Sequence, residues 1–583
     1  VRTMVAGAGG VDLGLLVVSA EEGVMPQTRE HLAILAMLEV PELVVALTRA
    51  DLVDEELLGL AELDVRDLLG GTPWPDAAIQ TCSGLTGQGV PELVAALGAS
   101  ATRLPPRSEG DVFRLPVDRS FSIRGFGTVV TGTTRDGHLS GRDALEILPG
   151  RRPVRLRGIQ VHGAAADEVG GGQRVALNLQ GIDAGDVPPG CWLATPGALA
   201  CSDRVDVSFR LLPDAPWPLE NNARVRFLCG TAELLATVRL MDPAGGAAPE
   251  RVEAGEEGLA QLALAAEAST VAGDRFVLRT ESPMLTVGGG FVLDPEPPLL
   301  RRRERPAAAE LHRVLVEPES SPPERLLALL ERDVCTALDR DALRRRLPPS
   351  CQPVEAAAAA VVASGQAVPL KSEPPAWSAT AVVQVWGPRI KDEVAKHHSK
   401  HPLLDGPQLA ELRQALRPEP SPRVFEALLD HLCEALGMER RGPRLAEPSH
   451  SGEPTPDLRA SLDRLVDALA AGGTHPPPLA EATAGLDLPP DALHWLVERG
   501  EVARVAEDYY VARDPFRDLV RRVVAHIRAH PEGVLTPGEF KEISGLSRRH
   551  AIPFLEYLDR QRITKRGPDG RATRDLPDWV DGS

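Results

Sequence analysis

Two strongly apolar runs joined by one helical segment most constrain how the first hundred residues can fold. The runs at residues 11–20 and 43–47 do not alternate between apolar and polar residues, so neither face of these strands is expected to be exposed to solvent. Residues 28–38, between the two runs, have the pattern of one helix. Strands buried on both faces are typical of parallel sheets covered by helices. Such sheets bind ligands at the carboxyl ends of their strands, and Asp51 falls just beyond the second strand. We therefore predict an α/β unit with a ligand-binding edge.

The loops at that edge resemble those with which translational GTPases read guanine. Residues 48–51 stand where that family has Asn/Thr-Lys-x-Asp, whose aspartate accepts hydrogen bonds from guanine nitrogens. Residues 83–85 follow another strand and match the Ser-Ala-Lys or Ser-Ala-Leu loop, with glycine in place of alanine. Arg49 replaces the family's lysine, and its planar guanidinium is suited to stacking on a base. The resemblance implies GTP as the cofactor, held by Thr48, Arg49, Asp51, Ser83, Gly84 and Leu85.

The part of a GTPase that holds the phosphates is not found in this sequence. A P-loop needs G-x-x-x-x-G-K-[ST], and no Gly-Lys pair occurs anywhere in the chain. Residues 67–70 spell the metal-binding D-x-x-G, but they follow the guanine motif within a helical pattern, so we interpret them as a coincidence. In the resembling family, the equivalent of residues 1–4 directly follows D-x-x-G-His, which places that segment upstream of Val1. A miscalled start codon and a true truncation both remain open, and Mg²⁺ is expected only with the missing segment.

Composition points to a cytoplasmic protein of several domains. A length of 583 residues corresponds to about four to six domains. No apolar stretch approaches the roughly 18 residues that span a bilayer, and residues 1–3 begin no signal peptide, so we expect no membrane association. The seven cysteines form no C-x-x-C pair, which argues against a disulfide framework and a zinc site, and we assign no metal ligands.

Charge is unevenly distributed along the chain. The net charge of −19 argues against a general nucleic-acid coat. Residues 516–583, however, carry 13 Lys and Arg against 10 Asp and Glu, a net charge of about +3. The sequence therefore places any nucleic-acid contact of the tail in the last domain.

Residues 109–198 predict a β-barrel domain, and residues 113–196 within it carry the strongest family signal. Residues 113–119 and 123–132 alternate short β runs with glycine turns at the spacing of a small barrel. They are similar to the second domain that elongation factor Tu shares with its relatives. Residues 159–163 and 172–179 resemble, more narrowly, the selenocysteine-specific elongation factors of bacteria.

Residues 199–296 predict a second barrel. They resemble the third domain of elongation factors, including a glycine triplet at 288–290. We attribute this triplet to strand bending rather than to phosphate binding, because no helix follows it.

In the resembling family the first barrel helps to cup the aminoacyl end of the tRNA. Asp118, Arg119 and Arg174 match positions that line this aminoacyl pocket. A selenol is largely ionised near neutral pH whereas the seryl hydroxyl is neutral, so a guanidinium pair in a poorly hydrated pocket favours selenocysteine. The alternative, that Asp118 and Arg119 form an ordinary ion pair and Arg174 is a surface residue, stays open.

Beyond a Pro- and Arg-rich joint, the remainder is helical and strongly charged. Amphipathic helices followed by short apolar pairs recur there, which predicts winged-helix units at residues 307–380, 381–450, 455–514 and 515–583.

The last of these units has the clearest signals. Thr536 begins a helix as N-cap, with Pro537 at N1 and Glu539 at N3. The next helix has two arginines in its first turn, where helix dipole and side-chain charge both favour phosphate oxygens. We expect RNA rather than DNA as the ligand. Because A-form major grooves are too narrow for side chains, the short helix would contact the phosphates of an RNA hairpin, although a merely solvated basic face remains the alternative. The residues expected to bind RNA are Arg548, Arg549, His550, Arg562, Lys565, Arg566 and Arg571.

The chain is thus identified as a member of the selenocysteine-specific elongation factor family. The predicted class is multidomain: a partial α/β P-loop GTPase domain at residues 1–101, two elongation-factor β-barrels, and a winged-helix array. The resemblance implies a monomeric, GTP-dependent translation elongation factor that delivers selenocysteinyl-tRNA to the ribosome at UGA codons marked by an mRNA hairpin, the SECIS element. Two other functions stay open: a GTPase-dead RNA-binding adaptor, and a general aminoacyl-tRNA factor with a winged-helix tail.

The lack of a P-loop in this sequence generates a first prediction. The purified polypeptide of residues 1–583 should not hydrolyse GTP, because no part of it matches the motifs that hold the phosphates, Mg²⁺ and the attacking water. Release of inorganic phosphate, measured with and without ribosomes, checks this expectation. Robust turnover would contradict it.

Overall fold

The computed structural model describes residues 4–5, 7, 9–104, 112–125, 127–242, 247–299, 305–317, 319–332, 337–348, 351–415 and 421–581. Residues 1–3, Phe126 and Cys335, on which parts of the sequence interpretation fall, lie outside this set. The chain divides into two compact units, residues 1–382 with 420–428 and residues 383–419 with 429–583. Among the described helices, none has the length and apolarity needed to cross a bilayer.

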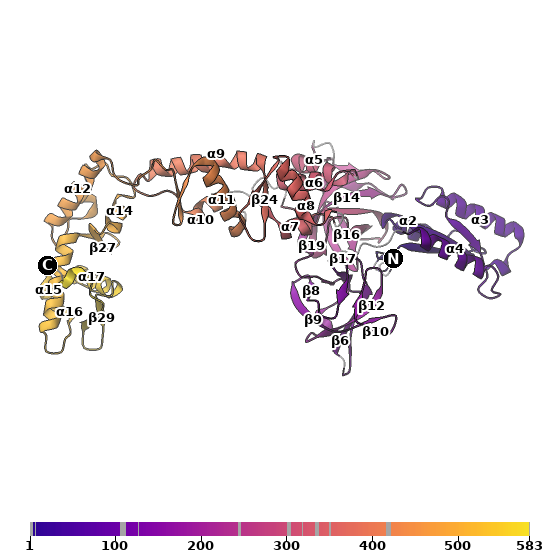
Figure 1. Ribbon diagram of the computed structural model, residues 1–583, viewed down its shortest axis with the longest axis horizontal. Coiled ribbons are helices and arrows are strands. Elements are labelled where there is room, and N and C mark those ends of the chain that lie inside the picture. Colours follow the sequence, from indigo (N-terminus) through magenta and orange to yellow (C-terminus); the bar gives the residue numbers. More distant parts are fainter. Residues whose placement is uncertain are drawn as a thin grey trace. The chain divides into compact units, whose positions relative to one another are not determined.

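A three-stranded parallel sheet with helices begins the chain (Figure 1). Its strands pair in the order β1 (Leu13–Ser19), β2 (Glu42–Thr48) and β3 (Ala78–Thr81). Its helices are α2 (Pro26–Met37), α3 (Glu55–Leu69) and α4 (Val90–Arg103), with a short turn, η1 (Ala50–Leu52), after β2. The predicted strand–helix–strand order is confirmed, and the D-x-x-G tetrapeptide indeed begins inside a helix, α3.

One prediction for this sheet is wrong in part. β1 is an edge strand, and although Leu16 and Val18 are buried, Leu15 and Val17 are 43% and 58% exposed. An open hollow of about 630 Å³ runs along β1 and the first half of α2. Only one face of β1 is covered by the described residues. The apolar run predicted burial of both faces, and this part of the prediction is wrong.

The next unit is an antiparallel sheet that curls around its own core. Eight strands pair in the order β4-β13-β8-β9-β12-β6-β5, with β10 added to β9, and β7 pairs with β11. Arg135 N–H donates to Arg114 O at 2.9 Å, so the segment after β6 returns to β4. The bounds are β4 (Arg114–Pro116), β5 (Arg119–Ile123), β6 (Gly127–Thr133), β7 (Leu139–Ser140), β8 (Leu145–Leu148), β9 (Arg152–Val161), β10 (Ala164–Ala166), β11 (Glu168–Val169), β12 (Arg174–Gln180) and β13 (Trp192–Ala194), with a short turn η2 (Ala184–Asp186).

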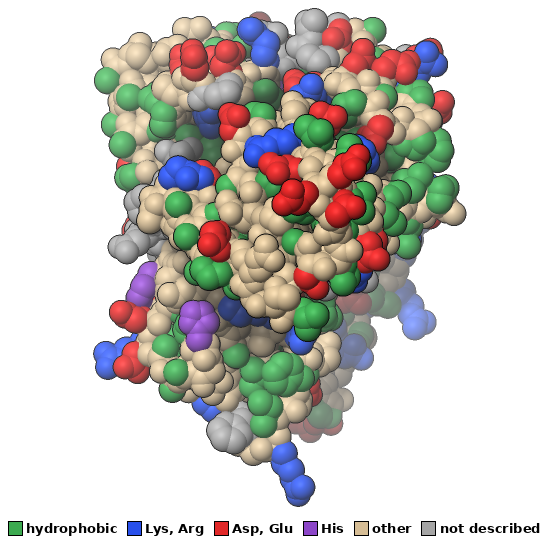
Figure 2. All heavy atoms as spheres, turned by 90° about the vertical axis from the view of Figure 1, so that its right-hand side faces the viewer, with side chains coloured by type: hydrophobic (Ala, Val, Ile, Leu, Met, Phe, Trp, Pro, Cys, Tyr) green, Lys and Arg blue, Asp and Glu red, His purple; other side chains and the backbone are tan. Residues whose placement is uncertain are grey.

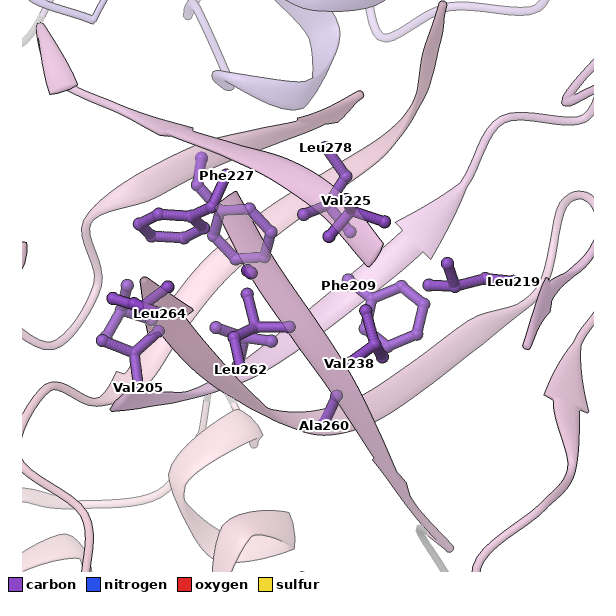
Figure 3. Close-up of a cluster of buried hydrophobic side chains, with 14 of the residues drawn as sticks. Val205, Phe209, Leu219, Val225, Phe227, Val238, Ala260, Leu262, Leu264 and Leu278 are labelled. Atoms are coloured by element: carbon purple, nitrogen blue, oxygen red, sulfur yellow. The ribbon is translucent and has the colours of Figure 1, made fainter. Parts of the chain in front are cut away.

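A closed six-stranded barrel follows, in the order β14-β19-β17-β16-β20-β21. Figure 3 shows its interior, where side chains such as Phe209, Phe227 and Leu262 meet from different strands. Alternation along each strand supplies this core, since every second residue points inward. The bounds are β14 (Ala200–Leu211), β16 (Arg224–Cys229), β17 (Ala232–Met241), β19 (Glu257–Thr270), β20 (Arg275–Thr280) and β21 (Thr286–Asp294), with a side ribbon of β15 (Leu219–Glu220) and β18 (Arg251–Val252).

The glycine triplet lies inside β21 and serves close packing. A Cβ on Gly288 would lie 2.5 Å from Arg210 O, and one on Gly289 would lie 2.6 Å from Phe276 O. These are backbone atoms of the neighbouring strands, which cannot move aside as a side chain can. The triplet therefore lets β14 and β20 approach β21, in accord with a role in strand packing rather than in phosphate binding.

Helix α2 packs against this barrel. Ile34 is fully buried in a cluster with Leu228 and Val277, and Glu30 Oε1 accepts a hydrogen bond of 2.8 Å from Thr286 Oγ1. The α/β unit and the barrel thus share a packed contact.

Four successive groups of helices and a β hairpin make up the rest of the chain. The first comprises α5 (Arg305–Val316), α6 (Pro322–Arg332), β22 (Ala337–Asp339), α7 (Arg340–Arg346), α8 (Val354–Ala363), β23 (Ala367–Leu370) and β24 (Ala376–Ala379). The second comprises α9 (Thr380–Lys400), α10 (Leu409–Ala415), α11 (Pro422–Leu436), β25 (Glu439–Arg441) and β26 (Arg444–Ala446).

The last two groups repeat this order more regularly. The third comprises α12 (Pro456–Ala471), α13 (Leu479–Ala482), α14 (Ala492–Glu498), β27 (Val502–Ala506) and β28 (Tyr509–Ala512). The fourth comprises α15 (Arg513–Ala529), α16 (Pro537–Ser544), α17 (Arg548–Arg560), β29 (Thr564–Arg566), β30 (Arg571–Thr573) and α18 (Asp578–Asp581). Three helices followed by a two-stranded wing is the winged-helix order, and the predicted multidomain class is confirmed.

The glycine packing generates a second prediction. Gly290→Ala should lower the free energy of opening of the barrel by about 1–3 kcal/mol, because the new Cβ would lie only 2.7 Å from Phe209 Cα. Hydrogen exchange of the β20 and β21 amides measures this loss locally. Gly59→Ala is the matched control: its Cβ meets nothing within 4 Å, and alanine within α3 should stabilise that helix slightly. Equal effects of the two substitutions would contradict the packing argument.

Candidate functional site

The two loops predicted to read guanine lie side by side at the carboxyl edge of the parallel sheet. β2 and β3 are adjacent, with Leu47 opposite Thr81, so their following loops emerge together. Ala50 N–H donates to Cys82 O at 3.3 Å and joins the loops directly. Thr48 closes β2 with a hydrogen bond from Oγ1 to Val18 O at 3.2 Å.

Within this edge, Asp51 and Arg49 behave differently. Asp51 lies in η1 and is exposed, so its carboxylate is open to a ligand. Arg49 has a left-handed backbone (φ 59°), and its guanidinium lies 3.2 Å from Glu21 and 3.4 Å from Glu22. The structure therefore directs Arg49 toward the loop after β1, where carboxylates compete with any stacking on a base.

The second loop is rigid at its base and open at its tip. Ser83 is fully buried, and its Oγ accepts N–H groups of Leu85 at 3.3 Å and Thr86 at 3.1 Å. Leu85 is 87% exposed, and a Cβ on Gly84 would meet nothing within 4 Å. The tip of this loop is therefore accessible to a ligand, whereas its first residue is held in place. Among the described residues, no loop has the composition of a phosphate cradle.

The predicted aminoacyl pocket residues come together on one face of the first β unit. Strand register places Arg119 opposite Thr131 and Arg174 opposite Thr133, so these side chains project from the same face of β5, β6 and β12. Asp118 accepts a hydrogen bond of 2.7 Å from Thr131 Oγ1 and forms a two-point ion pair with Arg174, with Nη2 3.0 Å from Oδ1. Sequence reasoning missed Thr131, although its place on a β run was visible.

The three charges of this face are not equivalent. Arg174 is paired with Asp118, whereas Arg119 is exposed and makes no ion pair among the described residues. Phe121 and Ile123 follow Arg119 on the same strand face and are each 42% exposed. On this part of the face, the Arg119 guanidinium therefore lies on the same strand as two exposed apolar side chains. The alternation in the sequence predicted the strand but not this exposure.

The last winged-helix unit presents an open helix N-terminus. Thr536 and Glu539 form a complete capping box on α16, and the hydrogen bonds from Thr536 hold the pKa of Glu539 below its usual value. By contrast, the side chain of Ser547 makes no capping hydrogen bond to α17. The first turn of α17 therefore keeps N–H groups for an anion, with exposed Arg548 and Arg549 beside them.

Not all of the predicted RNA-binding residues point to solvent. Arg562, Lys565 and Arg566 are exposed on and before the wing. Arg571, however, is 7% exposed, and its Nε donates to Asp559 Oδ2 at 2.8 Å, so it fastens the wing to α17.

His550 is also only partly exposed. Its ring stacks on Tyr509 with centroids 4.9 Å apart, and burial raises the pKa of Tyr509 to about 12. The structure thus separates Arg571 and His550 from the five exposed cations.

Two other described segments are poor candidates for nucleic acid. α8 carries no lysine or arginine, and Arg499, just after α14, is paired with Glu453. On the face turned to the viewer in Figure 2, acidic side chains gather among hydrophobic ones. The uncapped start of α17, with its two exposed arginines, is therefore a better candidate for phosphate contact than either of these segments.

Comparison with known proteins covers most of the chain. Residues 1–102 match the model of the elongation factor Tu GTP binding domain, and residues 202–299 match the β-barrel domain of the selenocysteine-specific elongation factor. Residues 391–446 and 525–572 match winged helices of elongation factor SelB.

Full-length relatives agree with these matches. The selenocysteine-specific elongation factor of Desulfomicrobium baculatum is 31% identical over 579 residues, which is 98% of this chain and 89% of that protein. The selenocysteine-specific elongation factor of Escherichia coli K12 is 27% identical over 591 residues, 98% of this chain and 88% of that protein. The crystal structure of a bacterial selenocysteine-specific elongation factor, EF-Sec, has the same fold, with a TM-score of 0.62 at 20% identity, over 98% of this chain and 88% of that one.

Proposed function

The chain belongs to the family of selenocysteine-specific elongation factors, and on that premise we propose that it delivers selenocysteinyl-tRNA to a ribosome at a UGA codon marked by an mRNA hairpin. The observation that carries the proposal is that Arg119 is exposed and makes no ion pair among the described residues, whereas Arg174 on the same face is paired with Asp118. We further propose that the protein acts as a monomer in the cytoplasm.

Selection of the aminoacyl group follows from charge. An ionised selenol carries one negative charge, and the face formed by Asp118, Arg119 and Arg174 carries a net charge of one positive unit. Asp118 holds the Arg174 guanidinium in an ion pair, so Arg119 is the arginine available to bind the selenolate. The seryl hydroxyl of the precursor is neutral and gains much less from this guanidinium. The sequence-based hypothesis had both guanidinium groups bind the selenolate. We modify it so that Arg119 binds the selenolate, while Arg174 is held in an ion pair with Asp118.

GTP is the cofactor that the amino-terminal unit implies. We propose that Asp51 accepts hydrogen bonds from guanine while the loop of Ser83, Gly84 and Leu85 covers the base. The two loops are joined at one edge, and Asp51, Gly84 and Leu85 are exposed there, while buried Ser83 holds the second loop. When bound, the nucleotide would supply the switch that times release of the tRNA. The exposed carboxylate of Asp51 supports a role in binding the base, whereas the described residues include no motif for its phosphates or Mg²⁺, so we derive no step through them.

The tail is proposed to hold the message. Exposed Arg548 and Arg549 at the uncapped start of α17 would contact hairpin phosphates, and Lys565 and Arg566 on the wing would extend that contact. Binding the hairpin and the tRNA through one chain raises the local concentration of the loaded tRNA at the marked codon.

Arg119→Ala tests the aminoacyl assignment. It should reduce the preference for selenocysteinyl-tRNA over seryl-tRNA by about 10-fold or more, because a charge-assisted contact is lost with one substrate only. Equilibrium binding of both tRNAs with GTP present measures this ratio. Arg155→Ala, which removes an exposed arginine from β9, is the control and should leave the ratio unchanged. A preference that survives Arg119→Ala would refute the assignment without affecting the proposal for the tail.

The double substitution Arg548→Ala with Arg549→Ala tests the RNA assignment. It should weaken hairpin binding by about 10-fold or more and make the slope of log affinity against log salt shallower by roughly 1.5, because about two phosphate contacts disappear. Arg464→Ala removes an exposed arginine of α12 and should change neither quantity. Unchanged hairpin affinity in the double variant would rule out this surface.

A further inference from the structure

Two buried aspartates lie side by side on neighbouring strands of the closed barrel. Asp206 on β14 and Asp294 at the end of β21 are register partners, and neither is exposed to solvent. Like charges opposite each other destabilise a sheet, and a buried carboxylate without a cation costs even more. This pair must therefore be neutralised by groups from elsewhere.

The neutralising groups come from the first winged-helix unit. Arg332, the last residue of α6, bridges the two carboxylates, with Nη1 2.5 Å from Asp294 Oδ2 and Nη2 in contact with Asp206 Oδ2. Arg346, at the end of α7, donates to both oxygens of Asp294, at 3.1 Å from Nε and 2.7 Å from Nη2. His312 on α5 places Nε2 2.9 Å from Asp206 Oδ2. Three helices of one unit thus converge on the aspartate pair.

The remaining hydrogen bonds at this cluster come from the barrel side. Gln261 Nε2 donates to Asp206 Oδ1 at 2.9 Å, and Glu296 N–H donates to Asp294 Oδ1 at 3.0 Å. All four carboxylate oxygens therefore have a partner, which is the condition under which buried ions are tolerated.

The ionisation states agree with this geometry. Burial alone raises the pKa of Asp206, but Arg332 and His312 outweigh burial and lower it to about 2. Burial likewise opposes ionisation of Asp294, yet Arg346 and Arg332 hold its pKa below the usual value. Burial and Arg332 lower the pKa of His312, which is neutral at pH 7. The cluster contains two negative and two positive charges and is neutral as a whole.

The same unit is poorly equipped to bind nucleic acid through α8, the helix that precedes its wing. The exposed positions of α8 are occupied by alanines and Glu355, whereas α17 of the last unit begins with two exposed arginines. Arg332 and Arg346 are 6% and 4% exposed and already engaged, so they are not free to meet phosphates.

We propose that the first winged-helix unit is a docking module whose partner is the closed barrel of the same chain, with Asp206 and Asp294 as the receptor for Arg332 and Arg346. The two arginines are positioning residues that make the barrel and the winged helix one rigid body. This role goes beyond tRNA delivery and does not depend on it, because it concerns contacts inside the chain.

Hydrogen exchange of the full chain, measured by mass spectrometry, tests the proposal. Arg346→Met should accelerate exchange in α5, α6 and α7 on the order of 100-fold, because one carboxylate loses its main cation, while β16 and β17 inside the barrel stay protected. Arg340→Met is the matched control: it removes a partly buried arginine of the same helix whose ion pair among the described residues is with its neighbour Asp341, and exchange should not change.

Two further variants separate charge from packing. Arg346→Lys keeps the charge but loses the forked contact, so its exchange should lie between those of the natural chain and Arg346→Met. Asp294→Leu combined with Arg346→Met removes both partners and should restore much of the protection, even where Arg346→Met alone fails to fold. The proposal would be overturned if Arg346→Lys exchanged as fast as Arg346→Met. It would also be overturned if the double variant exchanged as fast as Arg346→Met alone.

Discussion

Antiparallel strand register decides which charged side chains of this chain meet. In the first β unit, register places Arg119, Thr131 and Arg174 on one exposed face, with Asp118 beside them. In the closed barrel, the same rule places two carboxylates opposite each other in a buried position. Since a shift of one residue would turn each side chain to the other face, both clusters exist only while the register holds.

Whether an arginine of this chain forms an internal ion pair or remains available to a ligand depends on whether a carboxylate lies close to it. Arg174, Arg332 and Arg571 each have one and act within the protein. Arg119 and Arg548 make no ion pair among the described residues and remain available to a ligand. A guanidinium cannot be deprotonated, so its only alternatives are an internal anion, an external anion or water. The proposed division between structural and recognising arginines follows from this choice.

The amino-terminal unit illustrates a different constraint. Parallel strands end at one edge, and this alone brings the loops after β2 and β3 together around Asp51. The contact of α2 with the closed barrel, through Ile34 and Glu30, then ties this edge to the β units. The α/β unit is thus joined to the barrel through a packed helix.

The sequence by itself determined the elements and their order. The signals that predicted them were local: alternating and continuous apolar runs, the Thr536–Glu539 capping box and the family motifs. Because helices, strands and caps form from residues close in the sequence, these signals reappear in the structure. Only the tertiary structure decided which face of β1 is exposed and that Arg571 binds Asp559 of α17. It also decided that Arg332 and Arg346 contact two aspartates of the closed barrel, which lie more than thirty residues away in the sequence. The physical reason is that charge pairing depends on distance in space, which strand register and helix packing set and which neighbouring residues in the sequence do not reveal.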